Sequence, residues 1–203
     1  MKILQILPAL GQGGVERGTL EIAAALSRAG IENAVVSSGG AMVPQLEKTG
    51  ARHFTMQVQS KNPIRIIANA FAIASLAKKG GYTLMHVRSR APAWSVYFAS
   101  KISRIPYIAT YHGLYGTSPR LFKIPYNRVM LKGVKTIAVS DCVREHILRG
   151  GHELQHLLHA CHSHNGKHDA QDKRHGHGGL HRGVQAVHIP CPEILADQDS
   201  RAY

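Results

Sequence analysis

The chain has 203 residues, of which 44% are hydrophobic, and its formal net charge is +13 at pH 7. This length suits one domain or one and a half, and the hydrophobic fraction is sufficient for a buried core. The chain has 3 cysteines, widely spaced, which argues against a disulfide scaffold and favours a reducing compartment. Because no apolar stretch is long enough for a bilayer and the start lacks a signal-peptide cleavage site, we expect neither a transmembrane nor a secreted protein.

Charge and histidine content divide the chain into two parts. Residues 1–148 hold 19 basic and 6 acidic side chains, whereas residues 149–203 hold 6 of each. The second part also contains 10 of the 14 histidines and the low-complexity run H-G-H-G-G-L-H-R-G. Such a composition supplies no obvious core. We therefore predict one domain over residues 1–148, followed by an irregular, disordered His-rich tail over residues 149–203.

Strand and helix patterns alternate along residues 1–148. Short apolar runs predict strands at residues 2–7, 33–37, 53–58, 83–87, 107–111 and 136–139. Helical spacing predicts helices at residues 15–29, 43–49, 64–79, 93–103 and 121–132, and a last helix capped by Ser140. Strands joined by helices of this length form a parallel sheet covered on both faces. The predicted fold class is therefore α/β, a Rossmann-like doubly wound parallel sheet.

Ligands of such a fold bind outside the carboxyl ends of the strands. Glycines, arginines, a histidine and a serine are predicted at this edge, a set that suits an anionic or polyhydroxylated ligand. They lie at residues 11–14, 37–40, 88–90, 112–113 and 140–141.

The first turn at this edge reads G-Q-G-G-V-E-R and precedes a predicted helix. Backbone amides at a helix N-terminus approach a phosphate closely when no side chain intervenes. The turn is not a dinucleotide fingerprint, because Glu16 stands where a third glycine is needed, and no P-loop Gly-Lys-Ser/Thr follows. We interpret Gly13, Gly14 and Glu16 as phosphate- or sugar-binding residues, with a plain strand-to-helix turn as the alternative.

Tyr111 and His112 end the fifth predicted strand, in the segment A-T-Y-H-G-L-Y-G. A histidine at this place can hydrogen-bond a sugar hydroxyl or polarise a reacting centre, although a structural histidine is the alternative. Arg88 follows the fourth predicted strand, and its guanidinium suits a phosphate or a carboxylate. Arg90 fits a solvated loop better than a binding site.

Residues 120–135 place five cations among apolar side chains. This composition is typical of a surface that attracts anionic lipid, and it equally fits an ordinary amphipathic helix on a basic domain. Basic charge also serves nucleic-acid binding, but no nucleic-acid-binding module is present. We therefore expect an anionic membrane surface, and no nucleic acid, among the partners.

Three segments in this order resemble the N-terminal domain of family-4 glycosyltransferases of the GT-B fold: G-G-V-E-R, Y-H-G-L-Y-G and A-V-S-D-C-V-R-E-H-I. The resemblance implies a retaining hexosyltransferase that requires no metal or other cofactor. The donor would be a nucleotide-diphosphate sugar, and the acceptor a cell-envelope glycan or a lipid-linked molecule. Such an enzyme would be cytoplasmic or peripheral at the cytoplasmic face of the membrane.

The resemblance also implies roles for individual residues. Gly13 and Gly14 would contact the donor diphosphate, His112 would be the catalytic residue beside the transferred sugar, and Ser140 would lie at the floor of the cleft. The other substrate-binding candidates at this edge are Glu16, Arg88 and Tyr111.

Members of this family are longer, and a second Rossmann domain binds their nucleotide through a Glu-x7-Glu motif. Glu145 and Glu153 have this spacing, but they precede any second domain, so we treat the match as chance. We expect the chain to be truncated or frameshifted after about residue 148, to hold only the acceptor-side domain, and to be inactive alone. Another reading frame of the coding DNA should then restore an apolar alternating pattern, and its failure to do so would refute the frameshift.

The tail contains a resemblance to a zinc site. His152, Glu153 and His156 match the zincin signature, and His162 falls at the third metzincin ligand position. However, His159 replaces the metzincin glycine, no methionine follows for a Met-turn, and abundant histidines make such spacing common by chance. We assign no metal site. A non-catalytic His-rich metal-binding protein on a Rossmann-like domain is the competing hypothesis, and a zinc metalloprotease is a weaker one.

Overall fold

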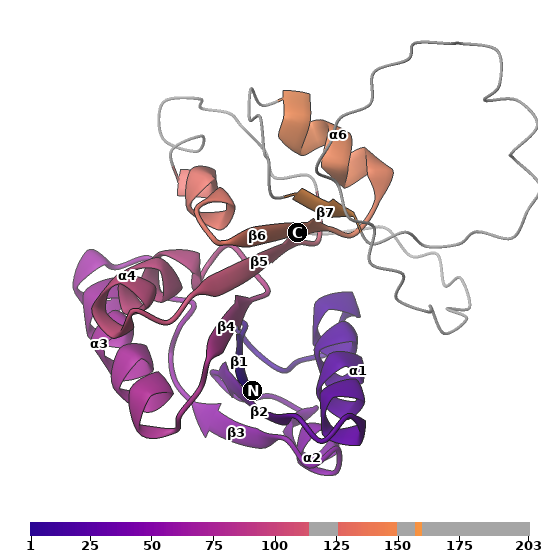
Figure 1. Cartoon of the computed structure of the whole chain (residues 1–203), viewed down its shortest axis with the longest axis vertical. Coiled ribbons are helices and arrows are strands. Elements are labelled where there is room, and N and C mark those ends of the chain that lie inside the picture. The colour runs from indigo at the N-terminus through magenta and orange to yellow at the C-terminus, as the bar shows by residue number, and fades with distance from the viewer. Residues whose placement is uncertain (114–125, 150–156, 160–203) are drawn as a thin grey trace, which may run out of the picture.

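The structure is a computed structural model that describes residues 1–113, 126–149 and 157–159 (Figure 1). Within these residues, seven strands form one sheet in the order β3-β2-β1-β4-β5-β6-β7, and all paired strands are parallel. The strands are β1 (Lys2–Ile6), β2 (Glu32–Ser37), β3 (Arg52–Thr55), β4 (Leu84–Val87), β5 (Tyr107–Tyr111), β6 (Lys135–Ala138) and β7 (Leu157–His159).

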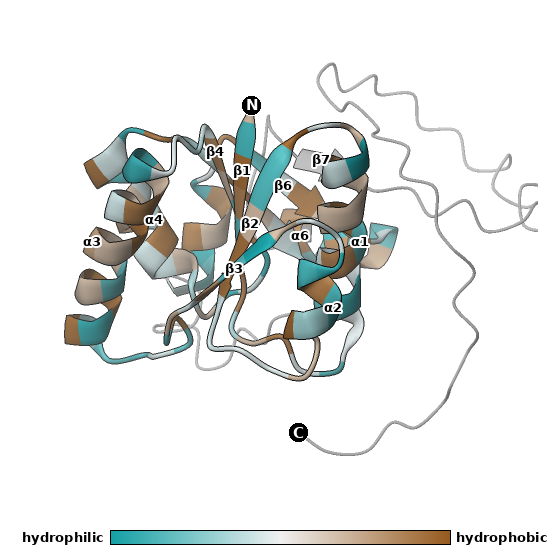
Figure 2. Cartoon of the chain, turned by 90° about the horizontal axis from the view of Figure 1, so that it is seen from below, coloured by the Kyte–Doolittle hydropathy of each residue, from teal (hydrophilic) through white to brown (hydrophobic). Residues whose placement is uncertain are grey.

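Helices cover both faces of this sheet, as Figures 1 and 2 show. α3 and α4 pack on one face, where Ile73 and Val96 join a core cluster with Leu4 and Ile6 of β1. α1 and α2 pack on the other face, where Ala23 joins a second cluster. The helices are α1 (Gly14–Arg28), α2 (Val43–Glu47), α3 (Pro63–Lys79), α4 (Ala93–Ser103) and α6 (Asp141–Arg149). This doubly wound arrangement confirms the predicted α/β, Rossmann-like class.

The strand order reverses direction beside β1, which pairs with β2 on one side and with β4 on the other. Doubly wound sheets bind ligands outside the carboxyl ends of the strands at such a reversal. The turns after β1 and β4 carry the glycines and Arg88 of the predicted site. The topology therefore brings these segments to one edge, although they are far apart in the sequence.

Two segments differ from the predicted elements. Of the predicted helix at residues 121–132, residues 126–128 are α-helical as expected, η1 (Val129–Leu131) is a 3-10 turn, and residues 114–125 lie outside the described part. β7 pairs with β6 from within the segment predicted as tail, so the sheet extends past residue 148. The remainder of the tail, residues 160–203, lies outside the described residues.

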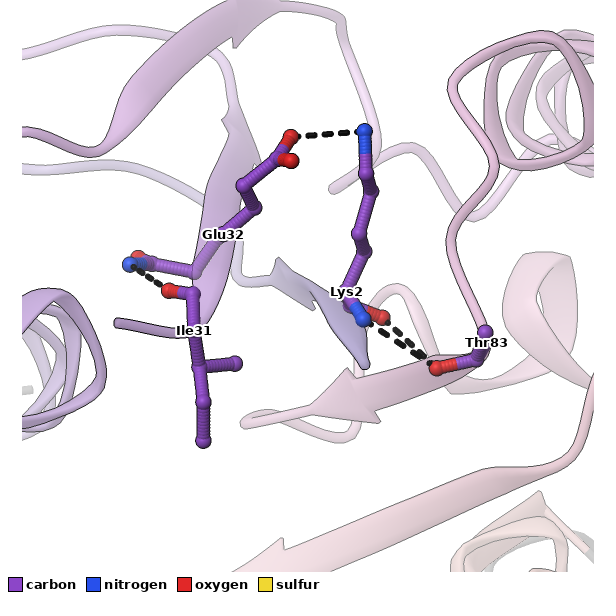
Figure 3. A network of polar contacts seen from close by, with 5 residues as sticks. Lys2, Ile31, Glu32 and Thr83 are labelled. Atoms are coloured by element: carbon purple, nitrogen blue, oxygen red, sulfur yellow. Dashed lines mark hydrogen bonds and ion pairs between the residues drawn. The ribbon is translucent and has the colours of Figure 1, made fainter. Parts of the chain in front are cut away.

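At the other end of the sheet, where the strands begin, polar contacts join neighbouring strands (Figure 3). Nζ of Lys2 lies 2.6 Å from a carboxylate oxygen of Glu32, and the backbone amide of Lys2 donates to Oγ1 of Thr83 at 3.2 Å. These contacts join β1 to β2 and to the residue preceding β4. Both ion-pair partners are well exposed, so the pair contributes little stability. In the part of the chain that the structure describes, no helix is long and apolar enough to cross a membrane.

Candidate functional site

The glycine turn after β1 leads directly into α1. Gly13 is the N-cap residue with an extended backbone, at φ 179, and Gly14 is the first helical residue. No side chain among the described residues caps this end of the helix, so within this part of the chain the first amides of α1 lack a side-chain acceptor. Amides in this position, together with the helix dipole, favour an anion.

The backbone does not require glycine at these positions. Neither Gly13 nor Gly14 has a left-handed backbone, and a Cβ on Gly14 would have no atom of the described residues within 4 Å. Gly40, in a neighbouring turn, is the contrast, because its φ is 144 and a Cβ there would overlap the carbonyl oxygen of Leu10. Gly40 is therefore structural, whereas the open space at Gly14 leaves the helix N-terminus accessible to a ligand.

Glu16 lies over this helix N-terminus. A Cβ on Gly13 would be 2.5 Å from Oε2 of Glu16, so the carboxylate folds back toward the N-cap. An acidic side chain in the first turn stabilises a helix through its dipole. The Glu16 carboxylate thus stands where an incoming phosphate would be attracted, and it must move for an anion to bind.

Arg88 follows β4 and is only 3% exposed. One guanidinium nitrogen donates to Oε1 of Gln5 at 3.5 Å, while its buried Nε has no hydrogen-bond partner among the described residues. Burial lowers the pKa of Arg88 to about 10, partly offset by the charge of Glu21. The guanidinium is still a cation at neutral pH. A buried cation without an ion pair is costly, which makes it a strong attractor for an anionic ligand.

Gly18 and Gln5 position this guanidinium, and neither was predicted from the sequence. A Cβ on Gly18 would lie 3.0 Å from Nη2 of Arg88, so the glycine leaves room for the arginine under α1. Gln5 is fully buried in β1 and also donates toward the carbonyl of Thr19 at 3.5 Å. A glycine inside a helix costs about 1 kcal/mol relative to alanine, so its presence was the signal that a close packing contact exists there.

His112 follows β5 at the same edge. Its Nε2 is buried and has no hydrogen-bond partner in the described residues. Burial, reinforced by the positive charge of Arg88, lowers the pKa of His112 to about 4. The imidazole is therefore neutral near pH 7, and a ligand hydroxyl that reached the buried Nε2 would supply its missing hydrogen bond.

His86 supports this arrangement from within β4. It is buried, and its Nε2 shares a hydrogen bond of 2.7 Å with Oγ1 of Thr110. Burial, followed by the charges of Arg88 and His112, holds the pKa of His86 well below its ordinary value. A second neutral imidazole therefore lies beside the same cation. The sequence prediction overlooked His86 because nothing in its local pattern separates it from an ordinary strand residue.

The other predicted site residues occupy different settings. Ser140 caps α6, where its Oγ accepts from the Val143 amide at 3.3 Å, as the sequence predicts. Tyr111 is buried in the core, and its hydroxyl donates to the carbonyl of Asn127 at 3.0 Å, so its substrate-binding role stays a prediction. Arg90, predicted in a solvated loop, donates to Oδ1 of the same Asn127 at 3.1 Å.

The Ser37–His53 pair has the residue types of a nucleophile and a base, with Oγ and Nε2 2.8 Å apart. Ser37 is fully buried, and its Oγ already accepts from the Gly39 amide at 3.1 Å. Unlike Nε of Arg88 and Nε2 of His112, this hydroxyl already has hydrogen-bond partners. The pair therefore joins β2 to β3 structurally.

The segment at residues 120–135 is described only from residue 126 onward. There, Val129 and Met130 are fully buried in the main core cluster, so they cannot contact lipid. Nζ of Lys132 lies 5.0 Å from the ring centroid of Tyr97. The apolar residues of this part stabilise the domain from within, and the predicted membrane surface at residues 120–135 stays a prediction.

Within the described residues, no group of three or more histidine, cysteine, aspartate or glutamate side chains could hold a metal ion. The zincin-like residues His152, Glu153, His156 and His162 lie outside the described part, as do the other histidines of residues 160–203. The competing metal-binding hypothesis therefore depends on residues whose structure is not described.

Solved structures similar to this chain include several sugar-handling proteins. A glycosyltransferase from Rickettsia africae ESF-5 is 43% identical with a TM-score of 0.69, and the match covers 78% of this chain and 42% of that one. Anabaena Alr3699/HepE in complex with UDP and glucose is 20% identical with a TM-score of 0.62, covering 79% of this chain and 44% of that one. The lipopolysaccharide outer core galactosyltransferase WaaB is 14% identical with a TM-score of 0.58, covering 77% of this chain and 44% of that one.

The last two likenesses show the fold alone, and this chain spans less than half the length of each of the three proteins. No curated protein matched the chain significantly. The family model described as Glycosyltransferase Family 4 matches residues 12–159, from the glycine turn through β7. This match spans more than half of the chain, and the chain belongs to Glycosyltransferase Family 4.

Proposed function

We propose that this chain is the acceptor-side part of a retaining GT-B glycosyltransferase. It would transfer a sugar from a nucleotide-diphosphate sugar to a cell-envelope glycan or a lipid-linked acceptor at the cytoplasmic face of the membrane. The family match and the bound UDP and glucose of Alr3699/HepE support the donor class. Because the chain covers less than half of these proteins, we propose that turnover requires a second, nucleotide-binding domain.

The observation that carries the proposal is the pairing of an open helix N-terminus with a buried cation. Gly14 leaves the first amides of α1 accessible, and Arg88 is a buried guanidinium with no ion-pair partner among the described residues. Once the Glu16 carboxylate has moved away from the N-cap, both features stabilise negative charge, which is what a departing diphosphate requires. We propose that these groups, rather than a metal ion, meet the diphosphate charge on this side of the site.

His112 contributes in its neutral form. With its pKa near 4, it is not an imidazolium at neutral pH, so it does not act as a general acid. Its unpartnered Nε2 instead hydrogen-bonds a hydroxyl of the transferred sugar. This interaction orients the sugar relative to the diphosphate.

Calorimetric titration of the full chain with UDP-glucose, with and without EDTA, tests the proposal. We expect weak binding that survives EDTA, no turnover by the chain alone, and a loss of affinity in Arg88→Met of at least about tenfold, because charged hydrogen bonds contribute about 1.5–3 kcal/mol. Arg28→Met, at the exposed far end of α1, is the matched control and should bind as the wild type does.

Gly14→Ala guards against a folding artefact, because the added methyl group meets open space. It should weaken binding in a fully folded protein. Unchanged affinity in both Arg88→Met and Gly14→Ala would contradict the proposed site. Loss of binding in EDTA would contradict the metal-free account, and turnover by the chain alone would contradict the need for a second domain.

A further inference from the structure

Helix α3 carries an apolar stripe on its solvent side. Ile64, Ile67 and Phe71 are 79%, 43% and 60% exposed, respectively. Their spacing of three and four residues places them on one helix face. The helix uses another face for the core, where it buries Ala70, Ile73, Ala74 and Ala77.

The fold does not need this stripe. Oδ1 of Asn62 caps α3 by accepting from the amides of Ile64 and Arg65 at 2.9 and 3.4 Å, and the buried face packs the helix onto α4 and the sheet. Figure 2 shows apolar residues alternating with polar ones along α3. Single exposed apolar residues are common, but an aligned group of three large ones indicates a surface that binds a partner.

The positive charge around the stripe indicates which kind of partner can bind there. Residues 48–140 contain 15 lysines and arginines and not one aspartate or glutamate. Lys61 and Arg65 are exposed at the start of α3, and Lys78 and Lys79 are exposed at its end. A two-fold dimer through this face would place like charges against each other, which disfavours a second copy of the chain. Apolar side chains flanked by cations instead match the acyl chains and headgroups of an anionic bilayer.

We propose that the exposed face of α3, formed by Ile64, Ile67 and Phe71 with their flanking cations, docks this protein on an anionic membrane surface. The apolar side chains insert between lipid headgroups while the lysines and arginines contact phosphate. This surface differs from the segment at residues 120–135, whose Val129 and Met130 are buried.

Docking through α3 would also determine where the candidate site lies relative to the membrane. α3 begins after β3, on the side of the sheet where the strands end, so its first turn lies at the same edge as the turns that carry Gly14, Arg88 and His112. A bilayer bound at Ile64, in this first turn, would thus lie near the end of the sheet at which a lipid-linked acceptor is expected. Docking itself does not depend on the transferase function.

Vesicle sedimentation of the full chain tests the docking. We expect binding to phosphatidylcholine vesicles that contain phosphatidylglycerol and much weaker binding to pure phosphatidylcholine, with a decrease when NaCl rises from ~0.1 to ~0.5 M. The triple variant Ile64→Gln, Ile67→Gln, Phe71→Gln should lower the partition coefficient at least about tenfold, because it removes the inserted apolar area.

Two matched controls define the outcome. Leu148→Gln changes an exposed apolar residue of α6, and Arg28→Gln removes an exposed cation of α1; both should bind as the wild type does. Because all three mutated α3 residues are exposed, the triple variant should keep the wild-type unfolding midpoint. Wild-type vesicle binding by the triple variant, or equal binding to neutral vesicles, would overturn the proposal. Arg128 is an exposed cation of the segment at residues 120–135, and loss of binding in Arg128→Gln alone would assign the docking to that segment and overturn the proposal too. A concentration-dependent dimer that the triple variant abolishes would assign the face to self-association and overturn it as well.

Discussion

A glycine at a helix start can be required by the backbone, or it can leave space for a ligand at the first amides. Replacing Gly14 by alanine distinguishes these two roles. A new Cβ at this position meets no atom within 4 Å, and the residue is already helical. Alanine also has the higher helix propensity. We therefore expect the free energy of unfolding to change by less than about 0.5 kcal/mol, with any change being a gain. The affinity for UDP-glucose should nevertheless fall about tenfold, or ~1.4 kcal/mol, because the methyl group separates the phosphate from the first amides of α1.

Gly40→Ala is the matched contrast for stability. Its φ of 144 suits glycine, and a Cβ there would overlap the carbonyl oxygen of Leu10. This variant should lose at least about 2 kcal/mol of unfolding free energy. Urea denaturation followed by circular dichroism measures both values, and calorimetry measures the affinity. If Gly14→Ala loses more than about 1 kcal/mol of stability, or binds UDP-glucose as tightly as the wild type, the account of the glycine turn is wrong.

Three further predictions concern the buried charges. Arg88→Met should raise the pKa of His112 above about 4 but leave it below the ordinary value of 6.5, because burial, the larger cause, persists; NMR titration of His112 checks this, and an unchanged pKa would refute the coupling. Thr110→Val should cost about 1–3 kcal/mol in urea denaturation, because Nε2 of His86 would be buried without a partner, and a neutral effect would contradict this role. Between pH 6.5 and 4 the unfolded chain protonates His112 while the folded protein does not, so His112 should contribute a loss of about 3 kcal/mol of stability as pH decreases, in addition to the loss from His86, whose pKa is also lowered. His112→Asn should make this part of the stability profile less steep, with the contribution of His86 remaining, and an equally steep profile in that variant would count against the assignment.

The strands and helices of the domain could be predicted because their apolar runs and turn residues agree locally. β5 (Tyr107–Tyr111) and α4 (Ala93–Ser103) begin and end at the predicted residues. β7 could not be predicted, since it has only three residues and lies within a His-rich segment. Its strand conformation depends on pairing with β6, which is a tertiary contact and leaves no mark in the local sequence.

The sequence predicts which turns come together to form the site, but it does not predict which side chains of the site are buried. The sheet topology places Gly14, Arg88 and His112 at one edge, as the sequence pattern indicates. The pattern does not show that Arg88 is buried under α1, because that depends on the space left by Gly18. It also does not identify the exposed stripe of α3, since apolar residues occur on several faces of that helix.

The central claim is that the edge formed by the glycine turn, Arg88 and His112 binds the donor of a sugar transfer. NMR spectra of the full chain during titration with UDP-glucose test it most directly, with zinc added in a separate titration. The account predicts saturable shifts of the Gly13 and Gly14 amides and of the His112 ring on adding UDP-glucose, with His112 remaining neutral at pH 7. Shifts confined to the histidines of residues 160–203, appearing with zinc and not with UDP-glucose, would contradict the account and support the metal-binding alternative.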